Sequence, residues 1–181
     1  MATKNRASRR TAAQVGVVMG SDSDWPLIEE TVKALDQFGV SREVRVMSAH
    51  RTPGLAAGYA RRAAGAGLKV IIAAAGNAAH LAGVLAAHTT LPVIGIPVPG
   101  GAVDGLDALL STVQMPGGVP VATVALGKAG AVNAAILAVQ ILALGNPSLG
   151  RKLALHKKSL AEKVKAGNTR VQSELRKRNP R

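Results

Sequence analysis

The stretch Ser48-Ala49-His50-Arg51-Thr52-Pro53 joins two segments of different periodicity, and this junction decides the fold. Before it, residues 44–47 form a short, mostly apolar run typical of a strand, and after it residues 53–66 have the spacing of a helix. Thr52 is a favourable N-cap, and proline suits the first helical position because its missing N–H would have had no partner there. We therefore predict a strand-to-helix loop that presents His50 and Arg51.

The same pattern repeats on both sides of this loop, where short apolar segments alternate with helical ones. Alternation of this kind is typical of a parallel sheet covered by helices on both faces. We expect an α/β fold, a three-layer αβα sandwich with a parallel, five-stranded, doubly wound (flavodoxin-like) sheet, plus a C-terminal helix. The expected strands are residues 15–19, 42–47, 70–74, 92–96 and 121–125, and the expected helices are 27–38, 53–66, 78–87, 104–113 (N-capped by Asp104), 128–144 and 149–165.

The formal net charge of +13 is concentrated at the two ends of the chain. Residues 1–14 carry four basic and no acidic side chains, and residues 150–181 carry eleven basic and two acidic ones, so the body is neutral. We expect a basic, disordered tail at 1–14, one catalytic domain at 15–147, a helix at 148–166 and a basic tail at 167–181. Basic tails adhere weakly to polyanions, and with three aromatic residues in all the chain offers little for bases to stack on, so specific nucleic-acid binding is not expected.

Several classes of protein are excluded or unsupported by the sequence. There is no cysteine, which excludes disulfides and thiolate metal sites. No apolar run reaches the roughly 18–20 residues that span a bilayer, and a cytoplasmic protein without membrane contact is expected. Neither a P-loop nor a dinucleotide GxGxxG motif occurs, so ATP-driven chemistry and nicotinamide or flavin cofactors are not supported.

The loop Gly20-Ser21-Asp22-Ser23-Asp24 also joins an expected strand to an expected helix. Its serine hydroxyls beside free helix N–H groups could hold a phosphate, and Asp24 could accept hydrogen bonds from a sugar diol. The alternative is that Ser23 or Asp24 only caps the helix. A metal site built on the two aspartates lacks further ligands.

Right-handed crossovers place every strand-to-helix loop at the carboxyl edge of the sheet, where ligands bind in folds of this kind. Loops 20–25, 48–52 and 75–80, and with them 97–104, are therefore expected to meet. His50 beside Arg51 is the best candidate for an anion-bound proton carrier. His80 either faces the same crevice or is a buried structural histidine. Residues 128–144 are apolar on nearly all sides, which fits either self-association or a thick core.

Five motifs resemble, in order and spacing, the catalytic-subunit family of phosphoribosylaminoimidazole carboxylase, in its bacterial form, N5-carboxyaminoimidazole ribonucleotide mutase (class I PurE). They are GSDSDW (20–25), SAHRTP (48–53), GNAAHLAG (76–83), LLSTVQMPGGVPVATVALGKAGAVNAA (109–135) and QILAL (140–144). The resemblance covers about residues 15–150. It implies conversion of N5-carboxyaminoimidazole ribonucleotide to 4-carboxy-5-aminoimidazole ribonucleotide in purine synthesis, without metal, ATP or organic cofactor, by a homo-octamer.

The resemblance also implies roles for individual residues. His50 would be the catalytic general acid and base, and Gly76, His80 and Leu81 would line the base. Ser21, Ser23, Ser48 and Arg51 would hold the phosphate, and Asp24 the ribose. The chain departs from the family pattern at Ala74, Asn77, Ala82, Gly100 and Ala108. Two alternatives stay open: a carboxylase that uses free carbon dioxide and aminoimidazole ribonucleotide, and a non-catalytic module that binds nucleotides or nucleic acid through the basic tails.

Overall fold

Strand β1 (Val15–Met19) lies inside a five-stranded parallel sheet of order β2-β1-β3-β4-β5. The computed structural model describes residues 12–178. All of β1 and the first five residues of β3 are buried, as expected for apolar strands covered on both faces, whereas β2 is a half-exposed edge strand. The predicted doubly wound α/β fold is confirmed. The other strands are β2 (Arg42–Val46), β3 (Val70–Gly76), β4 (Val93–Val98) and β5 (Ala122–Thr123).

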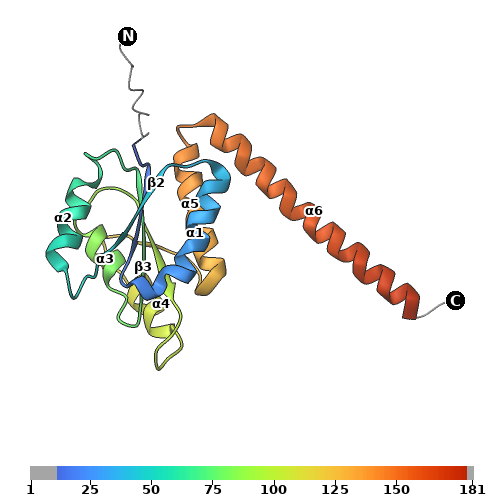
Figure 1. The fold of residues 1–181 in the computed structure, drawn as a ribbon, viewed down its shortest axis with the longest axis horizontal. Helices are drawn as coiled ribbons and strands as arrows, with labels where there is room; N and C mark the ends of the chain where they lie inside the picture. The colour runs from blue at the N-terminus through green and yellow to red at the C-terminus, as the bar shows by residue number, and fades with distance from the viewer. Residues whose placement is uncertain (1–11, 179–181) are drawn as a thin grey trace, which may run out of the picture. The chain divides into compact units, whose positions relative to one another are not determined.

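Helices cover both faces of this sheet, as Figure 1 shows. On one face α1 packs beside α5, and the Thr31 hydroxyl donates a buried 2.8 Å hydrogen bond to the Ala131 carbonyl. On the other face lie α2, α3 and α4, and a Cβ atom at Gly95 of β4 would touch both Thr112 of α4 and Ala82 of α3. The elements are the 3₁₀ helix η1 (Asp22–Asp24), α1 (Trp25–Phe38), α2 (Pro53–Ala63), α3 (Leu81–Ala86), α4 (Leu106–Val113), α5 (Gly127–Ala143) and α6 (Pro147–Arg178).

Two predicted helix starts were wrong. The helix predicted from residue 78 starts at Leu81, and Gly105, not Asp104, is the N-cap of α4. Asn77 and Asp104, which precede these helices, have positive φ angles of 52° and 55°. Both residue types tolerate this conformation better than most.

The described residues divide into two compact units, one ending at Ile141 and the other beginning at Leu142. In the second unit α6 continues to Arg178, so the predicted helix end near residue 166 was wrong, and residues 167–178 of the predicted basic tail are helical. Good helix formers such as Lys, Arg, Gln and Leu prolong the helix. The predicted N-terminal tail lies outside the described residues up to residue 11. Beyond that point the Ala12 carbonyl accepts from the Ser41 hydroxyl, and the Gln14 carbonyl accepts from the N–H groups of Lys69 and Val70, the first residue of β3. No helix within 12–178 is long and apolar enough to cross a membrane.

Candidate active site

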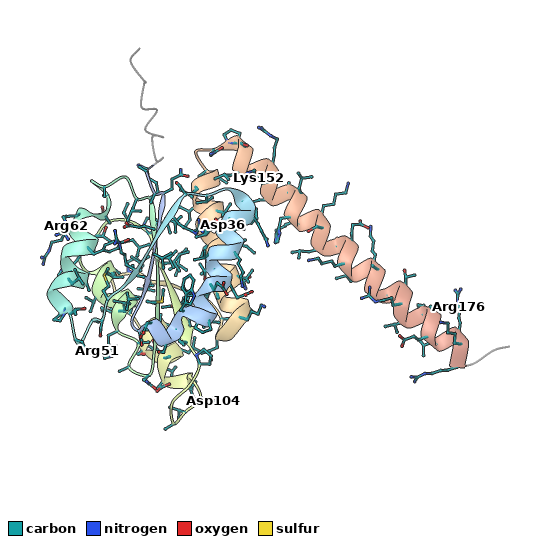
Figure 2. The ribbon with its side chains drawn as sticks, in the orientation of Figure 1. Asp36, Arg51, Arg62, Asp104, Lys152 and Arg176 are labelled. Atoms are coloured by element: carbon teal, nitrogen blue, oxygen red, sulfur yellow. The ribbon has the colours of Figure 1, made fainter. Side chains whose placement is uncertain are left out.

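The loops that follow β1, β2 and β3 line one cavity of about 440 Å³ at the carboxyl edge of the sheet. In Figure 2, Arg51 and Asp104 lie at this end of the domain, and Asp36 and Arg62, at helix C-termini, lie toward the other. The predicted meeting of loops 20–25, 48–52 and 75–80 is confirmed, whereas loop 97–104 supplies no lining residue. Eight of the nine predicted site residues line it, Ser21, Ser23, Asp24, Ser48, His50, Arg51, Gly76 and Leu81, together with Gly20, Ala49, Ala75, Asn77 and Ala78.

The loop after β1 is folded by its own serines. Ser21 Oγ accepts hydrogen bonds from the Ser23 N–H at 3.3 Å and from the Ser23 hydroxyl at 2.8 Å. Ser21 is thereby the N-cap of η1, and α1 follows directly with Pro26 in its first turn. Both hydroxyls stay exposed beside the start of a 14-residue helix, an arrangement that favours an anion.

Asp24 occupies the N-cap position of α1 but makes no side-chain capping bond. The alternative reading, that Ser23 or Asp24 only caps the helix, is therefore wrong for α1. Partial burial raises the pKa of the Asp24 carboxyl, and the nearby charge of Asp22 acts in the same direction, while hydrogen bonds from Ser21 and Ser23 and the charge of Arg51 oppose the rise. The carboxylate faces the cavity as a hydrogen-bond acceptor.

The loop after β2 is closed at both ends by hydroxyl groups. Thr52 is the N-cap residue of α2, as predicted, but its hydroxyl bonds the backbone of Ser48 instead of the helix, accepting from the N–H at 2.9 Å and donating to the carbonyl at 3.0 Å. Ser48 Oγ in turn accepts from the N–H groups of His50 and Arg51. These bonds fix the turn that carries both cavity-lining side chains.

Arg51 and His50 each reach a different neighbouring loop. Arg51 Nη2 donates to the Gly20 carbonyl at 3.0 Å, which ties the second loop to the first. His50 Nε2 lies 2.8 Å from His80 Nδ1, with the two rings 81° apart in an edge-to-face arrangement. One of these two nitrogens must accept, so the pair shares one proton across the contact. The sequence predicted His50 in the crevice and left His80 either facing it or buried; His80 is exposed and contacts His50 without lining the cavity. Neither this contact nor the bond to the Gly20 carbonyl was predicted.

The third loop is held in place from α4. Ser111 Oγ accepts from the Ala79 N–H at 3.0 Å and donates to the Asp107 carbonyl at 2.7 Å. The position of Ser111 within the motif LLSTVQMPGG did not predict that it would bond to the third loop. Asn77, which stands where the resembled family has glycine, lines the cavity, and its amide oxygen lies against Gly101.

Within residues 12–178 no three histidine, aspartate or glutamate side chains are grouped so that they could hold a metal ion. The polar side chains that line the cavity include serine hydroxyls, the Arg51 guanidinium, the Asp24 carboxylate and the His50 ring, which His80 contacts from outside the lining. The absence of a metal or cofactor from the reaction stays a prediction.

The fold and this cavity define a class of protein, a flavodoxin-like α/β protein with a small-molecule site at the β1/β3 switch point of its sheet. Within that class the sequence is more specific. The family model described as AIR carboxylase matches residues 14–163, and the chain belongs to that family.

Curated relatives agree with this assignment. A Mycobacterium tuberculosis protein is 56% identical over 88% of this chain and 90% of its own length. A Bacillus subtilis protein is 58% identical over 77% and 86%, respectively, and a Pseudomonas aeruginosa protein is 54% identical over 84% and 94%. Each of the three is named N5-carboxyaminoimidazole ribonucleotide mutase.

Solved structures of Treponema denticola PurE proteins share the fold. A single-residue variant of the T. denticola protein PurE2 superimposes with a TM-score of 0.80 at 25% identity, covering 88% of this chain and 98% of that one. T. denticola PurE gives a TM-score of 0.78 at 27% identity, covering 86% and 96%.

Proposed function

We propose that this chain is an N5-carboxyaminoimidazole ribonucleotide mutase, an isomerase of purine biosynthesis. The observation that carries the proposal is one cavity in which a loop histidine, His50, lies beside the basic side chain of Arg51 and across from the serine-rich turn after β1. The curated relatives bear the same activity in their names, which favours the mutase over a carboxylase that takes up free carbon dioxide.

The cavity offers complementary groups to each part of the ribonucleotide. We assign the phosphate to Ser21, Ser23, Ser48 and Arg51, where hydroxyls and a cation meet two helix N-termini. The carboxylate of Asp24 would accept from the ribose hydroxyls. Gly76, His80 and Leu81 would lie along the aminoimidazole ring.

The reaction moves one carboxyl group without net change in protons. The carbamate N–C bond breaks, the nitrogen takes up a proton, and carbon dioxide stays in the cavity. The ring carbon then bonds to carbon dioxide and loses its proton, which restores the aromatic ring. We assign both proton transfers to His50. While Nε2 is engaged with His80, Nδ1 is the nitrogen left to exchange the proton.

The direct test supplies purified protein with N5-carboxyaminoimidazole ribonucleotide, without ATP, and follows product absorbance. His50→Asn is expected to lower kcat at least about a hundredfold, the usual contribution of a general acid–base group, while circular dichroism and ribonucleotide binding stay unchanged. Near-normal turnover would remove His50 from the mechanism. A rate set by bicarbonate and aminoimidazole ribonucleotide would favour the carboxylase.

We also propose that the chain assembles as a homo-octamer and acts in the cytoplasm. In support of self-association, α4 exposes Leu106, Leu110 and Val113 at helical spacing, each about half accessible. Sedimentation equilibrium measures the octamer, and fractionation of cells producing the tagged chain measures the location.

A further inference from the structure

A row of apolar side chains runs along α6 with a repeat of eleven residues. Eleven residues make close to three helical turns, so such a repeat keeps its side chains on one line along the helix. We call this row the α6 stripe. It consists of Leu149, Leu160 and Val171, and of Leu153, Val164 and Leu175, the second set shifted by four positions.

Most side chains of the α6 stripe are exposed to solvent. Leu149 is buried, but Leu160 is 46%, Val164 73% and Val171 54% exposed. The row is narrow, about the width of the seam between two packed helices, and lacks the broad apolar face and the aromatic residues of a helix that lies in a membrane surface. The geometry therefore fits a second helix.

Leu149 is already buried, and the next four members, Leu153, Leu160, Val164 and Val171, have steps of seven, four and seven residues, which are the same read in either direction. A second α6 laid antiparallel, with Glu162 level with Glu162, brings Leu153 level with Val171 and Leu160 level with Val164. Self-complementarity of this kind is what a two-fold contact between identical chains requires.

The charges of α6 are compatible with the same register. The helix carries ten basic and two acidic residues, so two copies repel one another overall. In this register, however, no basic residue of one α6 lies level with a basic residue of the other. Lys152 lies level with Gln172, Lys163 with Ala161 and Arg170 with Ala154. By its spacing, Glu162 is on the side away from the stripe, where it pairs with Lys165 at 3.0 Å.

We propose that α6 pairs antiparallel with α6 of a second copy of this chain, along the α6 stripe and around a two-fold axis at Glu162. A polyanion bound to α6 would contact its basic side chains, and that contact would not account for the apolar stripe. Because like charges oppose the pairing and apolar contact drives it, added salt strengthens it, whereas salt weakens a contact with a polyanion. The matched family region ends at residue 163, within the seam, so the contact depends on the helix beyond it.

Cysteine cross-linking tests both the contact and its direction, because the chain has no cysteine of its own. Full-length chain carrying Leu153→Cys and Val171→Cys together is expected to give a covalent dimer under oxidising conditions. Eighteen residues of helix, about 27 Å, separate the two positions, so the disulfide forms only between copies. Each single variant is expected to stay monomeric on a non-reducing gel. Cross-linking of a single variant, or none in the double variant, would overturn the proposal.

A matched pair of surface variants gives a second readout. Val164→Glu places a charge on the stripe, whereas Leu155→Glu does so at an equally apolar position, 67% exposed, off the stripe. Val164→Glu is expected to lower the sedimenting mass at least twofold, and Leu155→Glu to leave it unchanged, with circular dichroism the same for both. The proposal fails if both variants behave alike, or if copies associate through α6 only when DNA or anionic vesicles are added.

Discussion

Asp24, to which we assign the ribose, also affects the stability of the fold. Burial raises the pKa of its carboxyl, so the folded chain holds a proton there that the unfolded chain has already released. The contribution of this group to the free energy of unfolding therefore falls as pH rises from the unfolded value of about 3.9 through the higher folded value. Below both pKa values the Asp24 carboxyl is neutral in the folded and the unfolded chain, and it then no longer lowers the free energy of unfolding.

Asp24→Asn is accordingly expected to be more stable than the natural chain at pH 7, with the difference narrowing toward pH 4. Its KM for the ribonucleotide should rise about ten- to a hundredfold, since a hydrogen bond to a charged group contributes about 1.5–3 kcal/mol. Thermal unfolding at the two pH values and steady-state kinetics measure these effects. An equal stability difference at both pH values would contradict the assigned cause.

The position of most candidate site residues could be predicted from sequence, because it depends only on which residues follow each parallel strand along the chain. Ser21 and His50 each follow a parallel strand, and parallel strands end at one edge. The contact between His50 and His80 could not be predicted, since it depends on how far the ring of each side chain reaches across the crevice. The hydrogen bond that the Ala79 N–H donates to the Ser111 hydroxyl was missed as well, because it joins residues 32 positions apart.

Among the helices and strands, Gly95 sets how closely α4 approaches β4. A Cβ there would lie 2.9 Å from Val121 Cγ1 and even closer to Thr112 Cγ2, with Ala82 at 3.4 Å. Gly95→Ala is therefore expected to lower the free energy of unfolding by about 1–3 kcal/mol, the usual effect of overpacking. Gly117→Ala is the control: a Cβ there meets open space, so its effect should stay within about 0.5 kcal/mol. Urea unfolding at one protein concentration gives both values, and equal effects would refute the packing argument.

Element boundaries were predictable only where local signals and tertiary contacts agree. Helix α1 ends at Gly39, in the left-handed conformation that makes glycine a helix terminator, as the sequence indicated. Strand β5 is limited to Ala122–Thr123, although the apolar run predicted residues 121–125, because only these residues pair with β4. The end of α6 was missed because Gly167 and Asn168 suggest a stop that the surrounding helix formers override.

Across the chain as a whole, the net charge and the candidate active site lie in different parts. The cavity-lining residues all fall between Gly20 and Leu81, inside the neutral body, whereas the net charge of +13 comes from the ends. Polyanion binding through the ends should therefore be separable from turnover. Within the body, Arg51 lines the cavity, but a single cationic side chain is not enough to bind a polyanion such as nucleic acid.

Deletion of residues 1–11 and 166–181 is expected to leave kcat/KM within about twofold of the full chain, since no lining residue is removed and Ala12 and Gln14 keep their hydrogen bonds. Binding to a double-stranded DNA of arbitrary sequence should be lost. In the full chain this binding should weaken with salt at a slope of about 0.9 per phosphate neutralised, because it releases counterions. Fluorescence anisotropy at several salt concentrations measures the slope, and product absorbance measures turnover. A DNA complex of the full chain that resists salt, or DNA binding that persists after the deletion, would contradict this prediction. The body itself would then bind nucleic acid, and DNA binding would not be confined to the ends of the chain.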